Sequence, residues 1–143
     1  MIKIQTKKNQ PLPVAIERLE QAVRVTLNFT QTPEDSAITL VLSDDKKLRQ
    51  LNRDFMGIDS PTDVLSFPAD FVDPDNQETY LGDIIISVPR AIAQAEENKA
   101  TAESELLLLA VHGSLHLLGY DHATSREKEK MWAVQNAIMD QLT

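Results

Sequence analysis

A run of six apolar residues, LLLLAV at 106–111, lies inside a segment of helical character that spans residues 102–118. A helix that is apolar on all sides has to be covered on all sides, so this segment is expected at the centre of the fold. The chain has 143 residues, which is enough for one hydrophobic core and leaves little room for a second. We therefore expect one domain, residues 1–143, built around this helix.

Hydrophobic periodicity predicts an α+β domain of four short strands and about five helices. The predicted strands are 2–5, 37–42, 64–67 and 80–87. The predicted helices are 14–27, 44–56 with Ser43 as its cap, 89–99, 102–118 and 125–142. A break at 7–11 follows the first strand, and Pro68 is expected to end the third before an acidic loop at 70–79. The last helix is expected to contribute Met131, Trp132, Ile138 and Met139 to the core.

Composition excludes several classes of protein. The chain has 14 basic and 22 acidic residues, a net charge of −8, so its overall charge does not indicate a nucleic-acid or membrane surface. An RNA site would have to be local, and Lys46, Arg49 and Arg53 form one basic ridge at helical spacing. The absence of cysteine excludes disulfides, thiolate zinc sites and a cysteine nucleophile. Because there is no signal-peptide core and no run of roughly 20 apolar residues, we expect a cytoplasmic protein.

All three histidines of the chain, His112, His116 and His122, lie in the segment HGSLHLLGYDH. Residues four apart on a helix share one face, with Cβ atoms about 5–6 Å apart, so His112 and His116 can bind one ion. Gly119 is expected to end the helix in the left-handed conformation and to let the chain bring His122 back toward the pair. Three imidazoles with an open fourth position are typical of catalytic zinc; nickel, copper and iron also bind imidazole. The alternative is three unrelated histidines with ordinary hydrogen bonds.

The same spacing occurs in metalloproteases with the motif H-E-x-x-H-x-x-G-x-x-H. In those enzymes the glutamate takes a proton from zinc-bound water. Gly113 occupies that position here and has no side chain that could act as a base. The segment therefore predicts a shared metal cradle without peptidase chemistry.

HGSLHLLGYDH closely resembles the signature H-G-x-L-H-L-x-G-Y-D-H of the YbeY family, metal-dependent single-strand endoribonucleases linked to bacterial rRNA maturation and ribosome quality control. PTDVLSFP at 61–68 and LGDI at 81–84 resemble two other blocks of that family. The resemblance implies a zinc ion on His112, His116 and His122, and a small mixed sheet flanked by helices. It also implies single-stranded ribosomal RNA near the 3′ end of the small-subunit rRNA as substrate. The partners would be the small ribosomal subunit and a ribosome-assembly GTPase, with no membrane association.

Hydrolysis also requires a group that accepts a proton. Asp121 is adjacent to a predicted ligand, Asp83 lies in a matching family block, and Asp63 stands at the entrance of the third strand. Each of these carboxylates also fits a turn, a cap or the support of a metal ligand. Ser66 is a further candidate for substrate contact, although serines in strands are more often structural.

One position departs from the family pattern. Family members carry an arginine after the aromatic residue of the segment that reads LNRDFMG at 51–57, where this chain has Met56. A guanidinium can hold a phosphate and a methionine cannot; Arg53, one turn earlier, is a candidate substitute. Two alternatives to a nuclease are therefore a non-enzymatic, metal-stabilised ribosome-maturation factor and another zinc hydrolase. Gly113 and the lack of a cysteine-containing deaminase signature disfavour the second.

Overall fold

Four strands form one mixed sheet, in the order β1-β2-β4-β3, in the computed structural model, which describes residues 1–7 and 9–143. The strands are β1 Ile2–Thr6, β2 Ser36–Ser43, β3 Val64–Val72 and β4 Thr79–Ser87. β1 and β4 both pair parallel with β2, and β3 pairs antiparallel with β4. The expected α+β class and mixed sheet are confirmed. Within the predicted break at 7–11, Lys8 lies outside the described residues.

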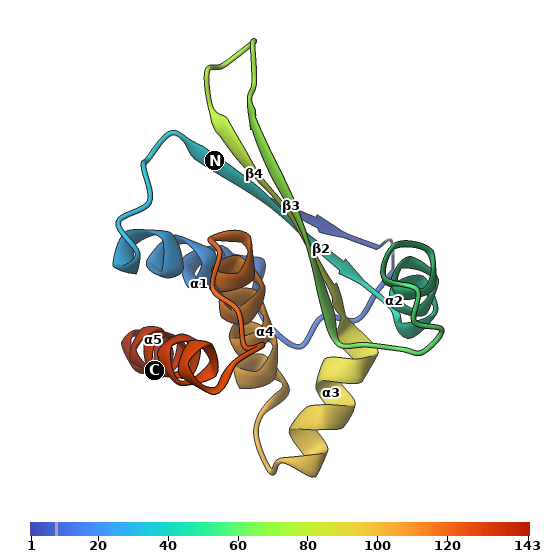
Figure 1. Cartoon of the computed structure of the whole chain (residues 1–143). Helices are drawn as coiled ribbons and strands as arrows, with labels where there is room; N and C mark the ends of the chain where they lie inside the picture. The colour runs from blue at the N-terminus through green and yellow to red at the C-terminus, as the bar shows by residue number, and fades with distance from the viewer. Residues whose placement is uncertain (8) are drawn as a thin grey trace.

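Helices cover the two faces of this sheet unequally. They are α1 Ile16–Phe29, α2 Asp45–Leu51, the π-helical turn η1 Asn52–Met56, α3 Val88–Glu97, α4 Ala102–Leu117 and α5 Ser125–Leu142. Figure 1 shows α1, α4 and α5 gathered on one side of the sheet and α2 on the other. In the described part of the chain, no helix combines the length and the apolar character that a membrane span requires.

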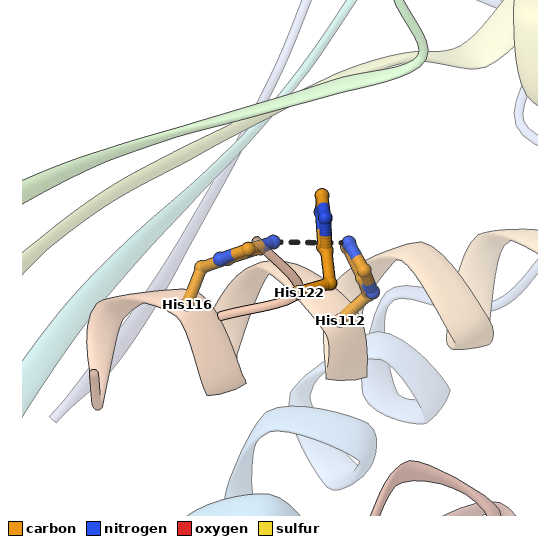
Figure 2. Close-up of side chains that lie close together, drawn as sticks. All are labelled: His112, His116 and His122. Atoms are coloured by element: carbon orange, nitrogen blue, oxygen red, sulfur yellow. Dashed lines mark hydrogen bonds between the residues drawn. The ribbon is translucent and has the colours of Figure 1, made fainter. Parts of the chain in front are cut away.

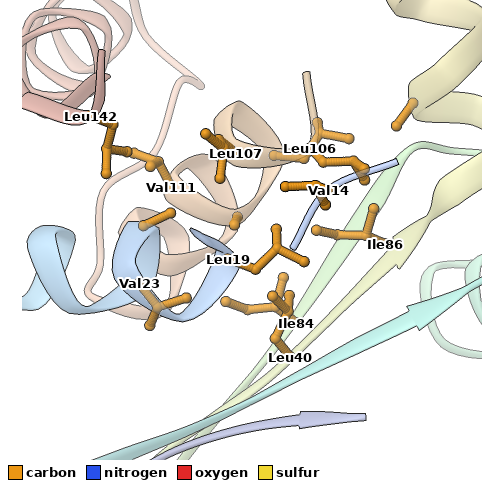
Figure 3. Packing of buried hydrophobic residues seen from close by; sticks show 14 of the residues in the cluster. Val14, Leu19, Val23, Leu40, Ile84, Ile86, Leu106, Leu107, Val111 and Leu142 are labelled. Atoms are coloured by element: carbon orange, nitrogen blue, oxygen red, sulfur yellow. The ribbon is translucent and has the colours of Figure 1, made fainter. Parts of the chain in front are cut away.

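Alternation along the strands produces two cores. On β4, Ile84 and Ile86 pack into the main core with α1 and α4 (Figure 3). Ile85, between them, belongs to a second cluster with Leu65 of β3 and Leu48 of α2. Residues of even and odd number around position 84 therefore lie on opposite faces of the sheet.

Helix α4 lies in the middle of the main core, as predicted. Leu106, Ala110, Val111 and Leu115 are all fully buried. The helix begins at the cap residue Thr101, whose side-chain oxygen accepts a hydrogen bond from the backbone N–H of Ser104 at 3.0 Å. A ligand carried by this helix is consequently held by rigid surroundings.

Gly113 allows α4 to approach the sheet closely. A Cβ atom at this position would lie 2.6 Å from Cγ2 of Ile84, which is too close for two carbon atoms. At the same level the hydroxyl of Ser66 on β3 donates a hydrogen bond to the carbonyl oxygen of Gly113 at 3.0 Å. These contacts fix the helix against β3 and β4 beside His112.

The structure corrects the predicted end of the third strand and the predicted cap of the second helix. β3 does not end at Pro68 but continues to Val72, because β3 is an edge strand and an edge strand tolerates a residue without a backbone N–H. Ser43 does not cap the next helix. It ends β2, and Asp44 caps α2 instead by accepting a hydrogen bond from the N–H of Lys47 at 2.9 Å. The predicted helix also changes to a π-helical turn at Asn52.

Candidate metal centre

His112 and His116 lie one turn apart on α4 and point to the same side (Figure 2). Their Nε2 atoms are 3.1 Å apart. For comparison, two ligands on a tetrahedral ion with bonds of about 2.0–2.1 Å are separated by roughly 3.3 Å. The two Nε2 atoms are therefore close to the separation that a shared ion would require.

His122 reaches the pair because α4 ends in a tight left-handed turn. Gly119 has a φ of 95°, and the N–H groups of Gly119 and Tyr120 donate to the carbonyl oxygens of His116 and Leu115 at 3.1 and 3.0 Å. These two bonds form the Schellman motif, in which glycine adopts the left-handed conformation without a steric penalty. The ring of His122 consequently lies 5.1 Å from that of His116, between centroids.

The three histidines together fit a metal ion. One ring nitrogen from each lies within 4.8 Å of the others. All three donors are imidazole nitrogens, a set that suits zinc and several other transition metals. The structure thus brings together the three histidines that the sequence singled out.

The surroundings favour neutral, metal-binding imidazoles on α4. Burial lowers the pKa of His112 below its ordinary value; His122 adds to this effect, while the hydrogen bond to Gln135 and the charge of Asp63 oppose it. Burial likewise lowers the pKa of His116, and repulsion from the other two histidines acts in the same direction. Because metals bind the neutral ring, these shifts reduce competition from protons near neutral pH.

Two residues of α5 complete the surroundings of the histidines. Oε1 of Gln135 lies 2.8 Å from Nδ1 of His112, and Gln135 is only 6% exposed. Trp132, predicted to belong to the core, is instead 37% exposed, and its ring meets those of His112 and His122 edge-on. The core prediction for Trp132 was therefore wrong. The core prediction is confirmed for Met131 and Ile138, which are both fully buried.

Sequence analysis missed Gln135, although a signal was present. Met131, Gln135, Ile138 and Leu142 recur at helical spacing and are all buried. A polar residue within such an apolar stripe needs a buried hydrogen-bonding partner. Here that partner is His112.

The histidines face a cavity of about 370 Å³ beside the edge strand β3. Its other lining residues are Thr62, Asp63, Val64, Leu65, Ser66 and Pro68. The wall opposite α4 therefore comes from the PTDVLSFP block. The hydrogen bond from Ser66 to Gly113 gives that serine a structural role at the junction between β3 and α4.

The three candidate carboxylates occupy different places. Asp63 lines the cavity with the histidines. Asp121 is exposed, and its Oδ1 accepts a hydrogen bond from the backbone N–H of His122 at 2.7 Å. Asp83 lies on the opposite face of the sheet. It is the neighbour of Ile84, whose side chain packs into the main core, and successive side chains of a strand point to opposite faces. Its partner on β3 is Phe67, which contacts Phe55 of η1. There Asp83 accepts a hydrogen bond from the hydroxyl of Tyr80, so the structure does not bring Asp83 to the histidines.

The basic ridge and Met56 lie outside the cavity lining. Arg49 and Arg53 are exposed and form ion pairs with Asp59 and Asp54. Lys46 is exposed beside Arg49 and Arg53 along the same surface hollow. Met56 is 48% exposed at the end of η1. The ridge is thus a solvated face whose positive charge is partly neutralised by neighbouring aspartates.

Glu105 provides a test of electrostatics near the site. It is 7% exposed and precedes His112 by two turns of α4. Burial, followed by the charge of Asp63, raises the pKa of the Glu105 carboxyl. Because the pKa of Glu105 is higher in the folded than in the unfolded protein, its protonated carboxyl stabilises the folded protein at pH values below the unfolded-state pKa. This contribution is lost as the pH rises through the folded-state pKa.

Glu105→Gln should therefore raise the midpoint of thermal unfolding by about 3 °C near neutral pH and by less than about 1 °C at pH values below the ordinary glutamate pKa. Scanning calorimetry at both pH values measures the difference. Glu103→Gln, at a more exposed position on the same helix, is the matched control. An equal gain for Glu105→Gln at both pH values would contradict this account.

Comparison with known proteins shows which family this chain belongs to. A family model described as Endoribonuclease YbeY matches residues 2–143. The chain belongs to the YbeY family. A relative from Desulfitobacterium hafniense, described as Endoribonuclease YbeY, is 46% identical over 130 residues, which are 87% of this chain and 83% of the relative.

A second YbeY relative and a solved structure are also similar to this chain. A Geobacillus thermodenitrificans protein with the same description is 42% identical over 139 residues, 92% of this chain and 88% of that one. The solution structure of a Thermotoga maritima protein matches with a TM-score of 0.66 and 28% identity, and covers 99% of this chain and 89% of the other. The YbeY resemblance predicted from three sequence blocks is therefore confirmed.

Proposed function

We propose that this chain is a zinc-dependent endoribonuclease that hydrolyses phosphodiester bonds in single-stranded RNA. The observation that carries the proposal is the convergence of three imidazoles on one cavity, in a YbeY-family chain whose relatives are named endoribonucleases. His112, His116 and His122 would hold the ion. Ring nitrogens favour zinc among the common metals, while nickel or another divalent metal fits the same donors.

The protein residues would supply positioning and proton transfer. When bound, zinc lowers the pKa of water and polarises a phosphoryl oxygen. Asp63 accepts the proton of the attacking water, because its carboxylate lines the same cavity as the histidines. The bond from phosphorus to the leaving ribose oxygen then breaks, and that oxygen takes up a proton.

Asp121 is proposed to act on the loop that carries His122. Its carboxylate holds the N–H of His122, and its charge opposes the lowering of the His116 pKa. Such contacts orient a ligand and increase its basicity. Asp83 receives no role in this proposal, because its side chain is on the other face of the sheet.

The biological substrate is proposed from family membership. It is ribosomal RNA, at the 3′ end of the small-subunit rRNA, during maturation and ribosome quality control in the cytoplasm. The small ribosomal subunit and a ribosome-assembly GTPase would be the partners. A cavity of about 370 Å³ has the size of a small-molecule site, which suits one nucleotide taken from a flexible strand.

The test is RNA cleavage by highly purified protein of known metal content. Metal-free protein should be inactive, and one equivalent of zinc should restore cutting of single-stranded ribosomal RNA but not of duplex RNA or an unstructured protein. Met56→Arg should increase cleavage by about tenfold, because one hydrogen bond to a charged group contributes roughly 1.5–3 kcal/mol. Met56→Gln is its uncharged control at the same exposed position.

Stoichiometric zinc binding without cleavage by either the wild type or Met56→Arg would overturn the nuclease proposal. That result would favour a non-enzymatic maturation factor, in which the metal only holds α4 and the His122 loop together. Cleavage of the unstructured protein would instead indicate another zinc hydrolase.

A further inference from the structure

Gln135 of α5 makes a buried contact with a proposed metal ligand from another helix. Its Oε1 lies 2.8 Å from Nδ1 of His112, and the two residues are 23 positions apart in the chain. We propose that Gln135 is a positioning residue of the metal centre, which selects the His112 tautomer whose Nε2 is free to bind metal. This inference rests on the proposed metal site.

The two ring nitrogens of a neutral histidine have opposite roles. One carries a hydrogen and donates, while the other has a lone pair that accepts a hydrogen bond or binds a metal. The carbonyl oxygen of Gln135 can only accept, so its contact requires the hydrogen of His112 on Nδ1. The lone pair is then on Nε2, the atom that faces His116 at 3.1 Å.

The opposite orientation of the amide would abolish this arrangement. If the NH₂ group of Gln135 faced the ring, Nδ1 would accept and Nε2 would carry the hydrogen. A protonated Nε2 could not bind an ion held by His116 and His122. The tautomer of His112 therefore depends on which end of one buried amide faces it.

A neutral acceptor has a specific effect on the charge of the centre. Three neutral imidazoles and a neutral amide leave the full charge of a divalent ion in place, whereas a carboxylate at position 135 would offset part of it. The proposed substrate is a polyanion, so the undiminished charge favours its phosphate. Glutamine thus orients His112 and keeps the site strongly positive.

The chain contains its own reporter for this contact. Trp132 is its single tryptophan, and the ring centroids of His112 and His122 lie 5.7 and 5.8 Å from that of Trp132. Tryptophan fluorescence should therefore follow zinc binding directly. No measurement of catalysis is needed.

The experiment compares zinc affinities of the full chain by chelator competition, with Trp132 fluorescence as the signal. Gln135→Met preserves the length of the side chain and removes the acceptor, and should weaken zinc binding about 10–100-fold. Gln135→Glu restores an acceptor and should bind zinc at least as tightly as the wild type. Asn136→Met makes the same replacement at the next, exposed position and should leave the affinity within about threefold.

A second measurement covers the case in which Gln135→Met does not fold. Nitrogen-15 NMR of the wild-type protein without metal reports which ring nitrogen of His112 carries the hydrogen, and Nδ1 is expected. A hydrogen on Nε2, or a Gln135→Met affinity within about threefold of the wild type, would overturn the inference. Failure of the wild type to bind zinc would instead refute the proposed metal site, so the two failures are distinguishable.

Discussion

The double variant His112→Ala, His116→Ala is expected to lose zinc binding and to cleave RNA no faster than the metal-free wild type. The two rings come from one rigid helix and supply two of three donors, so removing them leaves only His122 on an exposed loop. Loss of a contact outside the ligands already costs about 10–100-fold in metal affinity, and loss of two ligands should exceed that. Metal analysis after dialysis, together with single-turnover RNA cleavage, measures both effects.

Stability measurements keep this result interpretable. The thermal midpoint of the double variant should be compared with that of the wild type in chelator, because both then lack metal. His122→Ala, which leaves the helical pair intact, should retain weak zinc binding. Undiminished cleavage by the double variant would mean that the activity belongs to a contaminant or to another site.

Gly113→Ala is expected to lower the midpoint of thermal unfolding by about 3–9 °C. The added Cβ would meet Cγ2 of Ile84 at 2.6 Å, and overpacking of this kind costs typically 1–3 kcal/mol. Gly113→Glu would restore the protease motif in sequence but place a longer, charged side chain into the same contact. It should therefore disrupt the fold without creating a peptidase. Calorimetry and a casein assay measure these outcomes.

A second-site change tests whether Ile84 is the cause. Ile84→Ala removes the atom that clashes, so the double variant with Gly113→Ala should lose less stability than the sum of the two single variants. Strict additivity would show that the cost of Gly113→Ala arises elsewhere, for example in the hydrogen bond from Ser66 to the carbonyl of Gly113.

Local periodicity was enough to predict helix α4 and the grouping of the three histidines at its end. The apolar run at 106–111, the i, i+4 pair His112 and His116, and the helix end at Gly119 all depend on residues within one or two turns of each other. The same holds for the cap Thr124, whose hydroxyl accepts from the N–H of Glu127 at 3.2 Å at the predicted start of α5.

Contacts between distant segments could not be predicted in the same way. The face on which Asp83 lies depends on how β4 is registered against β2 and β3, and a strand pattern alone does not assign its two faces to particular helices. The partner of Gln135 and the environment of Trp132 depend on how α5 packs beside α4. Pro68 does not end β3, because an edge strand tolerates proline, and the position of β3 at the edge of the sheet is not readable from the local sequence.

The turn at Gly119 keeps the entropic cost of bringing the three histidines together low. The three histidines lie within eleven residues, so bringing them together closes only a short loop. The wall of the cavity is different, because the Ser66–Gly113 bond joins residues 47 positions apart and forms only when the sheet and α4 have docked. The grouping of the histidines and the formation of the cavity wall therefore depend on different parts of the chain. Substitutions in β3 can therefore change the shape of the cavity without separating the three histidines, because these are brought together by α4 and the turn that ends it.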